Sequence, residues 1–179
     1  SISSQIEQNV RVAMDLKVRT SGLLRQPYNF FEGDRLRFSL SNTSLISHGD
    51  SIAGGRNVTF RSRGLVRRVF IMQQDGHILA TARRQGLVSW YYNIELDGRQ
   101  YLLQGDSLWK MTLYLGGMPV GSVSRDELLP FDGFVWGFDG IHNSLWSFSF
   151  WLALKYWTGR RESRKPPGVD NNPGSIRWG

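Results

Sequence analysis

The chain contains no cysteine, which excludes disulfide bonds, cysteine metal sites and thiol nucleophiles. Proline is scarce, with 6 residues against 20 glycines, and this ratio favours a chain with many glycine turns. The sequence also lacks GxSxG, HExxH, P-loop and GxGxxG patterns. Its histidines, His48, His77 and His142, are not spaced as metal ligands are. We therefore expect no catalytic residues, no metal and no cofactor, and a protein that is not an enzyme.

Acidic residues are absent between Asp50 and Asp75 of a chain whose net charge is +7. The same interval holds five arginines: Arg56, Arg61, Arg63, Arg67 and Arg68. Strand alternation through RNVTFRSRG predicts that several of their guanidinium groups share one outer strand face. Guanidinium groups match the geometry of phosphate oxygens, so these five residues are the predicted site for an anionic ligand. The alternative is a solvated face that serves solubility alone.

Two segments near the N-terminus alternate between apolar and polar residues, which is typical of half-buried strands. Residues 9–19 place Val10, Val12, Met14, Leu16 and Val18 on one predicted face. Residues 35–40 place Leu36, Phe38 and Leu40 on one face, opposite Arg35, Arg37 and Ser39.

Three β-hairpins follow, each centred on a glycine-containing turn. The turns are Asp75–Gly76, Asp97–Gly98 and Gly116–Gly117, and each lies between two strand-like runs. Asp-Gly and Gly-Gly tolerate the positive φ angles of tight hairpin turns. No amphipathic helix lies between these hairpins, so the sequence predicts an antiparallel meander and not βαβ units.

Three segments lack strand or helix periodicity. Residues 47–57 and 130–143 are rich in glycine and polar or aromatic residues, and both are predicted to be loops. Residues 162–179 are polar and contain Pro166, Pro167 and Pro173. We expect the loop 47–57 and the tail 162–179 to be mobile. A docking site for a protein partner is an alternative role for the tail.

The segment 143–158 predicts a helix that is apolar on nearly every side, with Gly159 ending it. Such a helix is buried in a protein core or in a membrane. The run is short for a membrane span and contains Ser147, Ser149 and Lys155, so burial in protein is favoured. Ten or more antiparallel strands tend to close into a barrel, whose interior this helix would fill. The predicted fold is therefore a mainly β protein: a closed antiparallel barrel around a buried hydrophobic C-terminal helix.

This order of elements resembles the tubby C-terminal-like superfamily, which includes tubby domains, phospholipid scramblases and LURP-one-related proteins. The resemblance rests on the Asp-Gly hairpins, on GGMPVGSV at 116–123 and on FSFWLALKYWTGRR before the tail. Its pattern is most similar to small bacterial members of unknown function. It implies one domain over residues 1–161, with about twelve strands around a central helix, and a phosphoinositide-type ligand on the barrel surface. The chain lacks the cysteine-rich and acidic calcium-binding segments of scramblases, which argues against scramblase activity.

Together, these features favour a binding or scaffold protein for anionic lipid headgroups or other phosphorylated ligands. We expect a cytoplasmic protein that is either free or peripherally associated with a membrane. Nucleic acid is the less favoured polyanion, because the one clear helix is apolar and so unsuited to reading a groove. The alternative from another class is a hydrolase that uses the loop carboxylates of Asp132 and Asp139.

Overall fold

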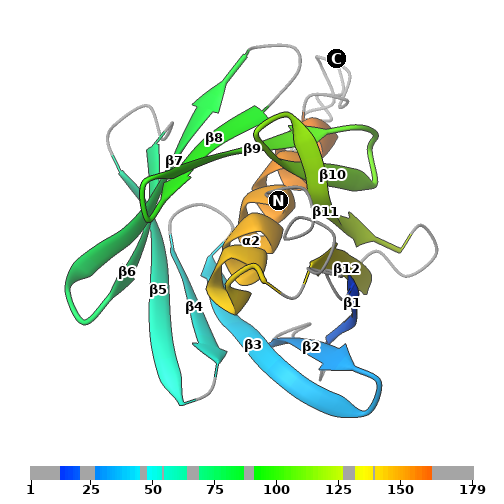
Figure 1. Ribbon diagram of the computed structural model, residues 1–179. Helices are drawn as coiled ribbons and strands as arrows, with labels where there is room; N and C mark the ends of the chain where they lie inside the picture. The colour runs from blue at the N-terminus through cyan, green and yellow to red at the C-terminus, as the bar shows by residue number, and fades with distance from the viewer. Residues whose placement is uncertain are drawn as a thin grey trace, which may run out of the picture.

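The computed structural model describes residues 13–20, 27–44, 48–53, 55–63, 69–86, 91–126, 132–138 and 140–162. These residues form a closed antiparallel barrel of twelve strands around one helix, as the sequence predicted (Figure 1). The first six strands are β1 (Ala13–Thr20), β2 (Tyr28–Glu32), β3 (Arg35–Ser44), β4 (His48–Ala53), β5 (Arg56–Arg63) and β6 (Val69–Gln74). The second six are β7 (His77–Gln85), β8 (Tyr91–Leu96), β9 (Arg99–Gly105), β10 (Lys110–Leu115), β11 (Met118–Arg125) and β12 (Gly133–Phe138). The helix is α2 (Asn143–Glu162).

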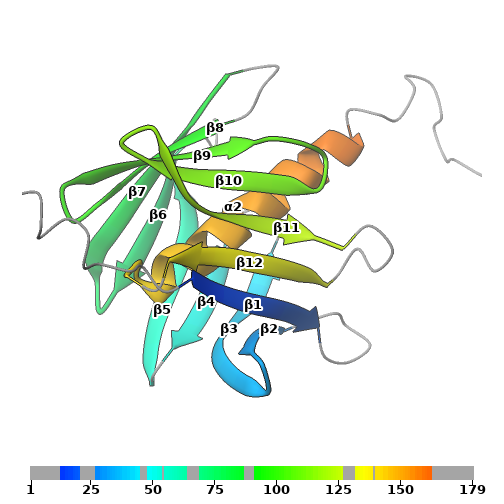
Figure 2. The same ribbon diagram turned by 45° about the vertical axis from the view of Figure 1, so that its right-hand side comes forward.

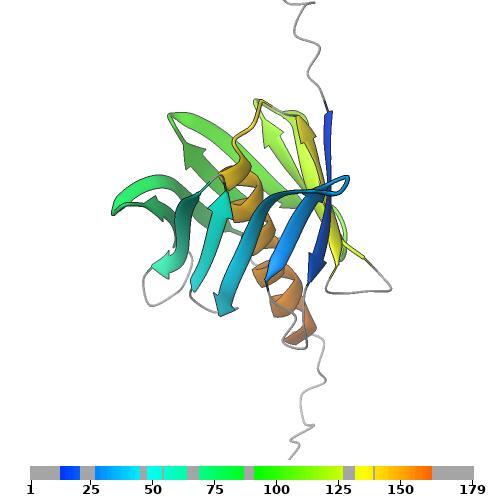
Figure 3. The same ribbon diagram turned by 90° about the horizontal axis from the view of Figure 1, so that it is seen from below.

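Each strand pairs with its neighbours in sequence, and β12 closes the barrel against β1. Successive connections therefore alternate between the two ends of the barrel. The end that holds the β2–β3, β4–β5, β6–β7, β8–β9 and β10–β11 turns also holds the start of α2; we call this end the mouth. Figures 2 and 3 show α2 running through the barrel from the mouth to the opposite end.

The predicted hairpin turns have the expected backbone. Asp75 and Asp97 both have φ of 50°, and the glycines after them have φ of 77° and 72°. Positive φ at both central residues identifies the tight turn that matches the twist of the flanking strands. The predicted inward face of β1 is confirmed for Met14, Leu16 and Val18, which are buried, whereas Val10 and Val12 lie outside the described residues.

The predicted faces of β3 are wrong at its first residues. Phe30 pairs with Phe38 but Phe31 pairs with Leu36, so Arg37 is the extra residue of a β-bulge. Beyond a bulge the alternation of side chains is shifted. As a result, Leu36 lies outside the barrel with 51% of its surface exposed, and Arg37 lines the interior at the mouth.

Two predicted loops are strands. Within 47–57, residues 48–53 form β4, so the expectation of a mobile loop there is wrong; within 130–143, residues 133–138 form β12. Gly49 and Gly137, two of the glycines that suggested loops, face α2. A Cβ at Gly49 would lie 2.9 Å from Trp151 Nε1, and one at Gly137 would lie 2.1 Å from Trp146 Cζ2. These glycines leave room for tryptophan rings, a role that composition alone does not distinguish from a turn.

The apolar helix fills the barrel as predicted. Every residue from Ser144 to Ala153 is buried, so α2 has no solvent face over that length. The helix continues through Gly159 to Glu162, so the predicted end at 158 is wrong; one glycine costs a helix only about 1 kcal/mol. Among the described residues, no helix is long and apolar enough to cross a membrane. The predicted tail lies outside the described residues, apart from Glu162.

Aromatic rings make up much of the contact between helix and barrel. Trp151 is surrounded by Phe60, Phe70 and Phe148, with ring centroids 5.5, 5.9 and 6.0 Å away. Phe150 contacts Tyr28 and Phe30 edge to face, at 5.5 and 5.2 Å. Such pairs add about 0.5–1.5 kcal/mol each beyond the area that they bury. The helix is therefore held by a continuous aromatic core.

Tyr92 gives the barrel a predicted sensitivity to alkali. Its hydroxyl donates a hydrogen bond to the Leu152 carbonyl of α2 at 3.3 Å. Burial raises the pKa of Tyr92 well above its ordinary value of 10.0. The unfolded phenol ionises first as pH rises, so the folded state loses stability above about pH 10, by about 1.4 kcal/mol per pH unit.

The test is urea unfolding of wild type and Tyr92→Phe between about pH 9 and pH 11. Near pH 9, Tyr92→Phe should cost about 1 kcal/mol for the lost hydrogen bond. Above about pH 10 the variant should lose stability less steeply than wild type, by the slope of one proton. Parallel pH profiles for the two proteins would contradict this account.

Candidate functional site

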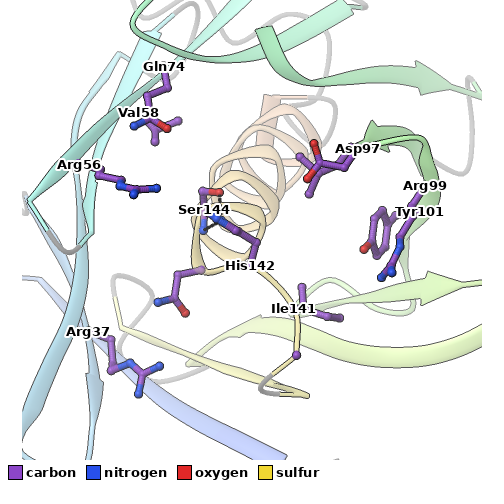
Figure 4. A pocket seen from close by; sticks show the side chains of 13 residues that line it. Arg37, Arg56, Val58, Gln74, Asp97, Arg99, Tyr101, Ile141, His142 and Ser144 are labelled. Carbon is purple, nitrogen blue, oxygen red and sulfur yellow. Dashed lines mark hydrogen bonds between the residues drawn. The ribbon is translucent and has the colours of Figure 1, made fainter. Parts of the chain in front are cut away.

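The mouth of the barrel contains a cavity of about 740 Å³ above the start of α2 (Figure 4). Among the described residues, its charged lining consists of three arginines from three different hairpins and one aspartate: Arg37, Arg56, Arg99 and Asp97. Most of its neutral polar lining comes from Gln74, Tyr101, His142, Asn143 and Ser144. Cavities of this size accommodate small organic ligands.

Strand alternation turns Arg56 and Arg99 toward the cavity. Arg56 begins β5 and lies two and four residues before the buried Val58 and Phe60, so its side chain is on the same face of the strand as theirs. Arg99 begins β9 and has the same parity as the buried Tyr101. This signal is visible in the sequence, but Arg99 does not stand out as part of a charge cluster, because no other arginine lies near it in the chain.

A bulge, by contrast, brings Arg37 to the cavity. Two other hairpins have a bulge at the same place on their second strand, and the extra residues are Leu79 in β7 and Val120 in β11. Both pack on the hydrophobic core, Val120 fully buried and Leu79 partly. Arg37 therefore occupies a position that accepts an aliphatic side chain elsewhere in this barrel. Regular alternation assigned it to the outer face, so the sequence did not reveal it.

The charges of the cavity are unequally compensated. Arg37 forms an ion pair with Glu32, with Nη1 and Oε2 2.5 Å apart. Within the described part of the chain, no ion pair involves Arg56 or Arg99. The Asp97 carboxylate likewise makes no hydrogen bond or ion pair among those residues. As far as the described residues go, the cavity thus presents two guanidinium groups and one carboxylate that no ion pair compensates.

The start of α2 adds hydrogen-bond donors to the floor of the cavity. The first turn of the helix contains no acidic residue, so the positive end of its dipole is not neutralised. The Ser144 N–H donates to His142 Nδ1 at 3.4 Å, and the Ser144 hydroxyl lies 2.5 Å from the same nitrogen. The backbone N–H of Ser144 is the donor in the first of these contacts, so His142 caps the start of the helix through Nδ1.

The structure separates the arginines of the predicted outer-face site. Arg61 and Arg63 are exposed on the outside of β5, two residues apart. Arg56, on the same strand, lines the cavity instead. Arg67 and Arg68 lie outside the described residues. Several arginines were predicted to share an outer face. Arg61 and Arg63 do share it, but Arg56 does not, because it is an odd number of residues from both.

Of the carboxylates of the hydrolase alternative, Asp132 does not line the mouth cavity. Asp132 precedes β12 at the opposite end of the barrel, where its Oδ1 accepts a hydrogen bond from the Thr20 N–H at 3.4 Å. Asp139 lies outside the described residues. The other two histidines are on strands: His48 lies in β4, 3.3 Å from Asp50, and His77 begins β7. Among the described residues, no three His, Asp or Glu side chains are grouped as a metal site.

No protein-family model matches the sequence, and no curated protein or solved structure is significantly similar to it. The resemblance to the tubby C-terminal-like superfamily therefore stays a prediction.

Proposed function

We propose that the protein binds a phosphorylated ligand in the mouth of its barrel and does not act on it chemically. The observation that supports this most directly is the set of arginines Arg37, Arg56 and Arg99, which three separate hairpins direct into one cavity. Like charges around one space repel each other, and a bound anion relieves that repulsion. Guanidinium forks and the start of α2 together suit phosphate oxygens.

The barrel around a central helix agrees with the fold that the tubby-like resemblance implies. This agreement supports membership of that superfamily as part of the proposal. The outer-face arginines Arg61 and Arg63 remain the competing location for the anion. They line neither the mouth cavity nor the second cavity, which lies beside Tyr101 and Tyr114, so the mouth is the better-supported site.

The phosphate has two possible sources, a soluble molecule or a lipid headgroup. Four exposed aliphatic residues lie close to the turns at the mouth, where they could reach the interface of a bilayer: Leu36, Ile52, Ile78 and Met118. Asp34 and Asp75 lie in two of the same turns and would oppose approach to an anionic surface. The shared chemistry is the phosphate group, and experiment must separate the sources.

Titration calorimetry with pyrophosphate tests the location of the site. Arg56→Gln and Arg99→Gln should each weaken binding about tenfold or more, because each removes charge-assisted hydrogen bonds. Arg37→Leu, which introduces the residue type found at the Leu79 bulge, should weaken it less, since Glu32 already neutralises Arg37. Binding should also fall as salt is raised.

The matched control is Arg61→Gln with Arg63→Gln, which removes two charges from the outside of β5. This double variant should bind pyrophosphate nearly as wild type does. If it loses binding while Arg56→Gln retains it, the site is on the outer face. Co-sedimentation with phosphatidylserine vesicles then distinguishes the sources: a lipid site requires vesicle binding that Arg56→Gln and Ile78→Asp both weaken.

A further inference from the structure

We infer that the mouth is selective for a phosphate ester that also carries hydroxyl groups, such as a sugar phosphate, and that Asp97 is the residue that recognises a hydroxyl. The inference rests on the proposed function and extends it to the class of ligand. The observation behind it is a carboxylate in the lining of a cavity whose other charged lining groups, among the residues that the structure describes, are arginines.

A site built for a bare oxyanion gains nothing from a carboxylate, because like charges repel. Asp97 nevertheless lines the cavity, and its carboxylate makes no hydrogen bond or ion pair with the other described residues. Its oxygens are therefore available as acceptors for a donor on the ligand. Figure 4 shows Asp97 on the same side of the cavity as Arg99 and Tyr101, facing Arg56 across it.

The chemistry of the donor follows from the neighbouring charges. An ammonium group beside Asp97 would be repelled by Arg99, which lies two residues away and lines the same cavity. A hydroxyl donates to a carboxylate and carries no charge, so it avoids that repulsion. Gln74 and Asn143 also line the cavity, and their side-chain amides both donate and accept. Neutral groups of this kind suit further hydroxyls.

The size of the cavity agrees with a ligand larger than an inorganic anion. A volume of about 740 Å³ lies in the range of sites for small organic molecules. Val58, Leu96 and Ile141 contribute apolar surface to the lining, on which the carbon face of a sugar could pack. The arginines would hold the phosphate, and Asp97 would fix the orientation of the hydroxylated part.

The barrel contains a matched control for Asp97. Asp75 occupies the same position in another Asp-Gly turn with the same φ of 50°, but it does not line the cavity. Asparagine and glycine both tolerate this backbone, and the barrel already contains a Gly-Gly turn at Gly116–Gly117, with φ of 59° and 78°. Asp97→Asn, Asp97→Gly and the corresponding Asp75 variants should therefore all fold.

The experiment measures binding of three probes by calorimetry: glucose 6-phosphate, cyclohexylmethyl phosphate and pyrophosphate. The first two have rings of similar size and differ in their hydroxyl groups. Wild type should prefer glucose 6-phosphate by about tenfold, the value of a hydrogen bond to a charged group. Asp97→Asn should reduce this preference, and Asp97→Gly should abolish it. Both should bind pyrophosphate more tightly than wild type does, because a like charge has been removed.

Opposite effects on two probes cannot come from a misfolded protein. Asp75→Asn and Asp75→Gly should leave all three affinities unchanged. Equal affinity of wild type for the two esters, or equal effects of the Asp97 and Asp75 variants, would overturn the role of Asp97. The proposed function would survive the loss of a role for Asp97, provided that Arg56→Gln still weakens the binding of every probe. Absence of binding for all three probes would overturn both.

Discussion

Gly137→Ala is expected to destabilise the barrel by about 3 kcal/mol or more, at the upper end of the usual cost of overpacking a core. A Cβ at this position would lie 2.1 Å from Trp146 Cζ2 and 2.6 Å from Cη2. Trp146 is fully buried. Gly137 is paired with Gly121, where a Cβ would lie 2.3 Å from Cη2 of the same indole. The indole therefore occupies a groove formed by two glycines, and an added methyl group must displace it or the sheet.

Urea unfolding measures this loss, and two further variants identify its cause. Gly140→Ala introduces the same methyl group where nothing lies within 4 Å, and should change stability by less than about 1 kcal/mol. Trp146→Phe removes the ring atoms that the new methyl would meet, at the cost of a cavity. Gly137→Ala should therefore be less damaging in the Trp146→Phe background, with a coupling of about 1 kcal/mol or more. Additive effects would show that the contact with Trp146 is not the cause.

The same contacts explain which parts of the fold the sequence could and could not predict. The hairpins at Asp75 and Asp97 were predictable because the turn requirement is local to two residues. The helix was predictable because it is apolar on all sides. Strands β4 and β12 were not predictable. Gly49 leaves room for Trp151, about a hundred residues further along the chain, and Gly137 leaves room for Trp146, about ten residues further along.

Similar reasoning applies to the candidate site. The sequence predicted arginine as the recognition group and singled out Arg56, because the density of charge is a local property. It assigned Arg56 to the wrong side of β5 and missed Arg99. Each of them lies an even number of residues from apolar residues of its own strand, and this spacing was present in the sequence. Arg37 could not be found in this way, because the bulge that turns it inward depends on how β3 pairs with β2.

Trp151→Asp is expected to abolish the folded state. Trp151 is 1% exposed and packs among Phe60, Phe70 and Phe148. Loss of a buried tryptophan costs about 3–5 kcal/mol, and a buried carboxylate without a partner costs several more. Lys155 Nζ lies 4.3 Å from the centre of the Trp151 ring, but the short aspartate side chain would not extend as far as the indole that it replaces. The sum approaches the whole stability of a typical domain, about 5–15 kcal/mol.

The soluble fraction on expression and the circular dichroism of any soluble protein test this expectation. Ile78→Asp is the matched control, because Ile78 is also apolar but is half exposed near the β6–β7 turn. That variant should be as soluble and as stable as wild type within about 0.5 kcal/mol. A soluble Trp151→Asp protein with cooperative unfolding would mean that the barrel does not depend on α2 for its core. The expected failure follows from the geometry: α2 is buried on every side, so no rotation of the helix could bring position 151 to water.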